Sequence, residues 1–125
     1  MIKIIIVGIG GFLGAISRYL TSRFVNRYFE TTQFPFGTLS VNMIGCFLIG
    51  FVMGLVENRD MFNPEVRSFI LIGLLGGFTT FSTFGYESYN LLRDGQILST
   101  ISNICIHVFI GLTLVWFGNF ISRLL

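Results

Sequence analysis

Charged residues are scarce in this chain, and their scarcity excludes several classes of protein. Only 8 residues are Lys or Arg and 6 are Asp or Glu, whereas 53% of the 125 residues are hydrophobic. An ordinary soluble domain has about 25% charged residues, and this chain has 11%. A net charge of +2, without a run of basic residues, gives nucleic acid no binding surface. We therefore expect an integral membrane protein that binds no nucleic acid.

Residues with acid–base or nucleophilic chemistry are equally few. The only histidine, His107, has no acidic neighbour in the sequence, and Cys46 and Cys105 stand alone in apolar stretches without the spacing of metal ligands. Isolated cysteines of this kind usually pack as small hydrophobic residues. Because no nucleophile, metal-ligand cluster or pair of acids is visible, the sequence does not predict an enzyme.

Long apolar runs, by contrast, fill almost the whole sequence. There are four, covering roughly residues 4–20, 39–56, 69–91 and 97–124. Each is near the length of about 20 residues that a helix needs to cross a bilayer. The short connectors leave no room for a soluble domain. We therefore predict an all-α membrane protein with four transmembrane helices, forming one domain over residues 1–125.

The positive charges do not determine which way this bundle is oriented. Four crossings place both termini on one face. The two faces carry nearly equal charge, with Lys3, Arg59, Arg67 and Arg123 on the face of the termini and Arg18, Arg23, Arg27 and Arg93 toward the other. The positive-inside rule therefore does not predict which face of the bundle lies in the cytoplasm. Either a weak bias escapes the count, or copies insert in both orientations and pair as an antiparallel two-fold dimer.

The most unusual stretch is residues 76–84, Gly-Gly-Phe-Thr-Thr-Phe-Ser-Thr-Phe, inside the third run. Two adjacent glycines followed by four hydroxyl residues disfavour a continuous helix. In hydrocarbon, a broken helix persists only where its freed peptide groups line a cavity, bind an ion or meet protein. We predict that the third helix is broken mid-membrane at the double glycine, where carbonyls could hold a cation and amides could attract an anion.

Uncharged hydrogen-bond donors gather around this stretch. They are the amide of Asn42 and the hydroxyls of Thr79, Thr80, Ser82 and Thr83. Phe81 and Phe84 share a helix face, and the edge of an aromatic ring is electropositive. Neutral donors suit a strongly hydrated anion that must be bound and then released. Phenylalanines at this spacing also occur in lipid contact or core packing, and Asn42 could instead bond two helices together.

Other polar residues could extend such a path toward the membrane surfaces. Ser99, Asn103, His107 and Gly111 recur every four residues and form one stripe of the fourth helix. The stripe could face a hydrated path, although a lone histidine in such a stripe is more often a hydrogen-bonded structural residue. Arg18 could reach the interface or attract anions at a pore mouth. Glu87 lies about a turn from its helix end, where we expect a vestibule.

The nine-residue motif of the third run resembles that of the small fluoride channels known as the Fluc family. Residues 37–42 (Gly-Thr-Leu-Ser-Val-Asn) and the first-run pattern Gly-x-x-Ser-Arg-Tyr around Arg18 extend the resemblance over essentially the whole chain. It implies a dual-topology, antiparallel homodimer with two pores, exporting fluoride passively across the inner membrane of bacteria. It also implies a structural sodium ion at the dimer centre.

The same resemblance implies particular site residues. The backbone carbonyls of Gly76 and Thr79 would bind sodium, so that two subunits supply four oxygens, as suits a hard cation. The implied pore residues are Asn42, Phe81 and Phe84 with the neighbouring hydroxyls of Thr80, Ser82 and Thr83, while Arg18 and Glu87 match charged positions near the pathway ends. The family often has a serine where this chain has Gly111. Either Thr113, Asn103 or a water replaces its hydroxyl, or the polar stripe of the fourth helix has a smaller part in the pathway.

A small multidrug exporter is the main alternative, since it too has four spans and can insert both ways. Proton-coupled export of cationic drugs needs a carboxylate within the membrane. The first run has no acid, and Glu87 is the only acid near the membrane interior. A packing subunit of a larger complex would explain the repeated Gly-xxx-Gly spacing but not the hydroxyl-rich stretch. The pairs with this spacing are Gly10 and Gly14, Gly50 and Gly54, and Gly73 and Gly77.

Overall fold

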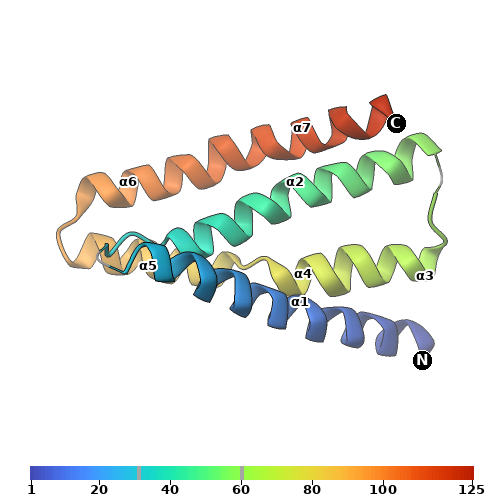
Figure 1. The fold of residues 1–125 in the computed structure, drawn as a ribbon, viewed down its shortest axis with the longest axis horizontal. Coiled ribbons are helices and arrows are strands. Elements are labelled where there is room, and N and C mark those ends of the chain that lie inside the picture. The colour runs from blue at the N-terminus through green and yellow to red at the C-terminus, as the bar shows by residue number, and fades with distance from the viewer. Residues whose placement is uncertain (31, 60) are drawn as a thin grey trace.

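A computed structural model describes residues 1–30, 32–59 and 61–125, and long helices make up most of them (Figure 1). Helices α1 (Ile2–Tyr28) and α2 (Phe36–Arg59) are continuous. The third helical segment consists of α3 (Pro64–Arg67), the π-helix η1 (Ser68–Leu75), α4 (Gly76–Phe78) and α5 (Phe81–Arg93). The fourth consists of α6 (Ile97–Cys105), the π-helix η2 (Ile106–Ile110) and α7 (Gly111–Leu124).

The four predicted membrane crossings are confirmed. Within the described residues, 4 helical segments are long and apolar enough to span a bilayer: Ile2–Tyr28, Phe36–Arg59, Pro64–Arg93 and Ile97–Leu124. They alternate in direction, so both termini lie at the same end (Figure 1). Large apolar side chains cover the outside, with Phe12 65%, Leu98 79% and Leu112 67% exposed. Such a surface suits lipid or another subunit, and the chain is a multi-pass membrane protein.

Local sequence signals account for several helix ends. Asn63 caps α3 by accepting a hydrogen bond from the Val66 amide at 2.8 Å, and Pro64 follows at the first helical position. Asn26 Oδ1 accepts from the Gly37 amide at 2.9 Å and so satisfies a donor in the first turn of α2. Gly95, at φ 76°, forms the turn between α5 and α6. Only glycine adopts that conformation without cost.

Glycines bring the helix backbones into direct contact at two interfaces. Where α1 meets η1 and α4, a Cβ on Gly14 would lie 2.2 Å from the Leu74 carbonyl oxygen. Where α2 meets α7, a Cβ on Gly50 would lie 2.0 Å from the carbonyl oxygen of Val115. The small-residue spacing seen in the sequence therefore serves close helix packing.

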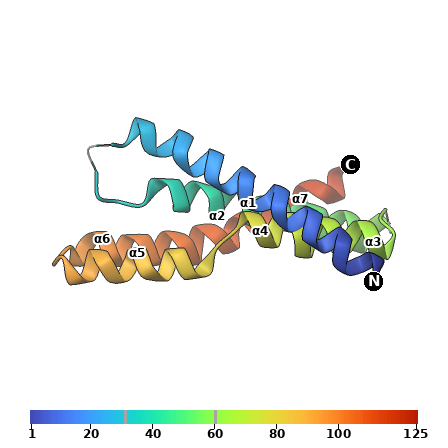
Figure 2. The same ribbon diagram turned by 90° about the horizontal axis from the view of Figure 1, so that it is seen from below.

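The third segment changes its packing partner along its length. Its first half, through α4, packs along α1, whereas α5 packs along α6. Figure 2 shows α1 and the start of α2 diverging from the pair α5 and α6 at one end of the molecule, while the elements converge at the other. The connection between α4 and α5 lies near the middle of the length, where the two layers part (Figure 2).

Candidate ion pathway

Two threonines interrupt the regular backbone between α4 and α5. Thr79 (φ −85°, ψ 158°) and Thr80 (φ −151°, ψ 117°) are extended. The sequence placed the interruption at Gly76 and Gly77, but both are helical and the extended residues follow Phe78. The reason is packing, since a Cβ on Gly77 would lie 2.6 Å from the Gly11 carbonyl oxygen of α1. Gly77 thus allows α4 to pack directly against α1.

The side chain of Asn42 in α2 binds the extended backbone. Its Oδ1 accepts from the Thr80 amide at 3.0 Å, and its Nδ2 donates to the Thr80 carbonyl at 3.1 Å. In a continuous helix the Thr80 amide would instead bond the carbonyl of Gly76. One carboxamide therefore satisfies both peptide groups of Thr80 and leaves the Gly76 carbonyl without its helical donor.

The predicted hydroxyl residues begin α5 as a connected group. Thr80 Oγ1 accepts from the Thr83 amide at 3.3 Å and donates to the Thr83 hydroxyl at 3.0 Å. The Ser82 hydroxyl lies 3.4 Å from the Thr80 hydroxyl. Thr80 is thus the N-cap of α5. Thr79 is not part of this connected set, because its hydroxyl donates to the Leu75 carbonyl at 2.9 Å.

The two predicted phenylalanines occupy different surroundings. The ring of Phe84 lies 4.2 Å from that of His107, centroid to centroid, at 36°. Phe81 lies 5.6 Å from Phe84 at 55° but is 83% exposed on this protomer. Phe84 therefore belongs to the cluster around Asn42 and His107, and Phe81 extends outward from it.

The polar stripe of the fourth segment points to two different neighbours. Asn103 is fully buried, and its Nδ2 donates to the Ser88 hydroxyl of α5 at 2.9 Å. His107, in η2, reaches α2 instead, with Nε2 3.2 Å from Asn42 Nδ2. A Cβ on Gly111 would meet Cys46 Sγ at 3.4 Å, so this residue packs on α2. Thr113, one of the candidates to replace the missing serine, donates its hydroxyl to the Phe109 carbonyl of its own segment at 2.8 Å.

Of the two predicted charged residues, Arg18 lies at the extended segment and Glu87 lies farther along α5. Arg18 Nη1 is 3.4 Å from the Thr79 carbonyl oxygen. Glu87 Oε1 accepts from the Thr38 hydroxyl at 2.7 Å, and its other oxygen is buried without a partner among the described residues. Arg18 thus touches the extended backbone, while Glu87 connects α5 to the first turn of α2.

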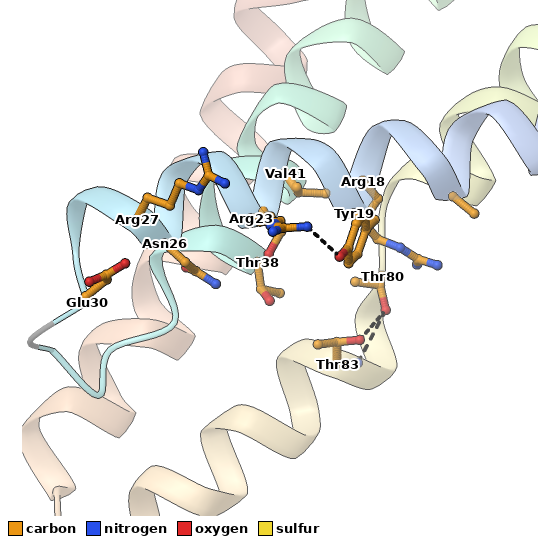
Figure 3. A pocket seen from close by; sticks show the side chains of 12 residues that line it. Arg18, Tyr19, Arg23, Asn26, Arg27, Glu30, Thr38, Val41, Thr80 and Thr83 are labelled. Atoms are coloured by element: carbon orange, nitrogen blue, oxygen red, sulfur yellow. Dashed lines mark hydrogen bonds between the residues drawn. The ribbon is translucent and has the colours of Figure 1, made fainter.

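Two cavities lie beside this segment, and Thr80 lines both. The larger, about 760 Å³, is lined by Ala15, Arg18, Tyr19, Ser22, Arg23, Asn26, Arg27, Glu30, Thr38, Val41, Thr80 and Thr83 (Figure 3). It carries three arginines against one glutamate, which favours anions. The smaller, about 370 Å³, is largely apolar and includes Asn42, Phe81, Phe84 and His107 in its lining. The residue that Asn42 holds therefore stands between a basic cavity and a mainly apolar one.

A cation at this place would need backbone ligands. Over residues 1–30, 32–59 and 61–125, no group of three His, Cys, Asp or Glu side chains could hold a metal ion. The carbonyl of Gly76 has lost its helical donor to Asn42, and carbonyl oxygen is a suitable ligand for a hard cation. The carbonyl of Thr79 accepts from Arg18 at the long distance of 3.4 Å. One of the two predicted sodium ligands has therefore lost its helical donor, and the other accepts one long hydrogen bond.

Sequence reasoning missed the partners that hold two of the site residues. Thr38 binds Glu87, and Ser88 binds Asn103. Thr38 lies four residues before Asn42 on α2, so its spacing on a shared face was a usable signal. Ser88 gave no comparable signal, because its role depends on how α5 and α6 pack.

Comparison with known proteins agrees with the motif. The family model for CrcB-like protein, Camphor Resistance (CrcB), matches residues 5–119. A fluoride-specific ion channel FluC of Citrifermentans bemidjiense is 43% identical over 125 residues, covering 100% of both chains. The FluC of Flavobacterium psychrophilum is 41% identical over 98% of each chain, and FluC 1 of Methanosarcina acetivorans is 44% identical over 95% of this chain and 89% of its own. The chain therefore belongs to the CrcB-like family of fluoride-specific ion channels, as its third-segment motif predicted.

Proposed function

We propose that this protein is a fluoride-selective channel that lets fluoride leave the cytoplasm passively across the cell membrane and so confers fluoride resistance. The observation that carries the proposal is the extended peptide of Thr80, held by Asn42 between a basic and a mainly apolar cavity. A break within a membrane persists only where its freed peptide groups line a cavity, bind an ion or meet protein, and Thr80 both meets Asn42 and lines the two cavities. The names of the relatives specify the ion as fluoride.

The pathway uses neutral donors together with ring edges. Arg18, Arg23 and Arg27 concentrate anions in the larger cavity. The hydroxyls of Thr80, Ser82 and Thr83 then offer donors in place of water, and the edges of Phe81 and Phe84 follow on the same helix. None of these later groups carries a full charge, so the anion is not trapped.

The working unit we propose is an antiparallel dimer with one chain in each orientation. Phe81 is 83% exposed on the single chain, as expected of a residue that meets a second subunit. The nearly equal positive charge at the two ends allows both orientations. Two-fold symmetry then gives two pores and brings the Gly76 and Thr79 carbonyls of both chains together around a structural sodium ion.

Fluoride efflux from vesicles that contain the purified protein tests the proposal. Vesicles loaded with fluoride should release it without an energy source once potassium and valinomycin carry the compensating charge. Vesicles loaded with chloride should retain it. Equal release of the two anions would overturn the selectivity, and proton-driven uptake of a cationic dye would favour a multidrug exporter.

Replacing sodium tests the proposed central ion. In N-methyl-D-glucamine, a cation too large for a four-carbonyl site, the dimer should dissociate or fluoride flux should fall, because unpaired carbonyls would face each other. Returning sodium should restore both. If the particle size and the fluoride flux are unchanged in the large cation, the dimer needs no structural sodium ion and this part of the proposal is wrong.

A further inference from the structure

The orientation of the Asn42 carboxamide is determined by the peptide it binds. A peptide N–H can only donate and a peptide C=O can only accept. Asn42 Oδ1 must therefore be the atom 3.0 Å from the Thr80 nitrogen, and Nδ2 the atom 3.1 Å from the Thr80 oxygen. The atom 3.2 Å from His107 Nε2 is this same Nδ2. Since the amide nitrogen only donates, Nε2 of His107 must accept.

The other ring nitrogen leads to the same assignment independently. His107 Nδ1 lies 2.9 Å from the backbone carbonyl of Asn103, which only accepts. Nδ1 therefore carries the hydrogen. Both contacts are satisfied by one form of the ring, the neutral tautomer protonated on Nδ1. The ring of Phe84, 4.2 Å away, packs against the imidazole from α5 and limits its rotation.

We propose that His107 is a positioning residue for Asn42. Its Nε2 lone pair takes the second N–H of the amide, so the carboxamide stays against the Thr80 peptide while no anion is present. An arriving anion would take the place of His107 as the acceptor of this N–H, while the bonds between Asn42 and Thr80 stay intact. The reason is that Asn42 makes two hydrogen bonds to the Thr80 peptide and one to His107. This exchange rests on the proposed fluoride pathway, whereas the tautomer and the contact do not.

Nitrogen NMR tests the tautomer without reference to conduction. His107 is the only histidine in the sequence, so protein labelled with ¹⁵N-histidine gives the signal of one ring. In bilayers without fluoride, at a pH where the ring is neutral, we expect Nδ1 protonated and Nε2 unprotonated. Asn42→Ala should shift the Nε2 resonance, because it removes the donor. A proton on Nε2, or an Nε2 signal indifferent to Asn42→Ala, would overturn the proposal.

Paired substitutions test the positioning role in transport. His107→Gln keeps an acceptor that can reach Asn42, whereas His107→Leu has similar bulk and no acceptor. The glutamine variant should keep most of the fluoride efflux, and the leucine variant should lose about tenfold, the effect expected from one unsatisfied buried donor. If His107→Gln and His107→Leu have the same particle size and release fluoride at equal rates, the positioning role is wrong.

The outcomes separate this inference from the function on which it rests. If the unaltered protein does not release fluoride, the proposed function fails while the NMR result still decides the tautomer. If the unaltered protein releases fluoride but the glutamine variant is as impaired as the leucine variant, only the inference fails. Should the leucine variant not fold, the glutamine variant and the NMR measurement decide.

Discussion

Replacing Asn42 by alanine should slow fluoride efflux about a hundredfold while the four helices still form. The substitution leaves both the amide and the carbonyl of Thr80 without the partners they now have at 3.0 and 3.1 Å. Each partly buried group that loses its partner costs about 1–3 kcal/mol, and a loss of about 2.7 kcal/mol from the conducting conformation corresponds to a factor of one hundred in rate. Efflux from vesicles, normalised to protein content, measures the effect.

Asn58 on the same helix provides the matched control. Its Nδ2 donates to the Gly54 carbonyl of α2 itself at 2.7 Å, so it holds no other element in place by this bond. Asn58→Ala should therefore leave the efflux rate unchanged. If Asn42→Ala also conducts at the unaltered rate, the extended Thr80 peptide is not part of the pathway.

Adding one methyl group at Gly14 or Gly50 should strongly destabilise the folded protein. The new Cβ would lie 2.2 Å from the Leu74 carbonyl oxygen in the first case and 2.0 Å from the Val115 carbonyl oxygen in the second. Backbone atoms of a packed helix cannot move aside cheaply, so we expect a loss of about 3 kcal/mol or more. Unfolding in mixed detergent, followed by circular dichroism, measures the loss for Gly14→Ala and Gly50→Ala.

Gly8→Ala on α1 is the control for the glycine variants. No atom lies within 4 Å of a Cβ built there, and the residue is helical. Alanine in place of a helical glycine should raise the stability by about 0.5–1 kcal/mol. If Gly8→Ala and Gly14→Ala change the unfolding free energy by the same amount, the close backbone contact at Gly14 does not determine stability.

The number and approximate positions of the membrane crossings could be predicted because they depend on composition and length. A hydrophobic run long enough to cross the bilayer forms a helix, because a helix satisfies every peptide group within the run itself. The start of the third segment could also be predicted, since Asn63 and Pro64 form a local signal that needs no distant partner. The helices extend past the predicted runs, because polar ends such as residues 21–28 continue α1 outside the apolar stretch.

The position of the extended residues could not be predicted, because it depends on contacts between distant segments. Gly76 and Gly77 are the residues with the most backbone freedom, but α1 packs on Gly77 and keeps it helical. Thr80 has less freedom but a partner in Asn42, 38 positions away along the chain. A pattern of propensities contains neither contact.

The polar stripe of the fourth segment shows the same limit. A period of four correctly placed Asn103 and His107 one turn apart, and the Asn103 carbonyl does bond the His107 ring. The π-helix η2 begins between them, however, and its wider turn changes which neighbour each side chain meets. Asn103 therefore contacts α5 and His107 contacts α2.

The reversal potential of the current through reconstituted protein tests the central claim most directly. With a tenfold fluoride gradient across a planar bilayer and equal chloride and pH on both sides, the current should reverse at the fluoride equilibrium potential, about 59 mV from zero. Adding a chloride gradient should leave that potential unchanged. A reversal near zero under the fluoride gradient, or one that follows the chloride gradient, would contradict a fluoride-selective channel.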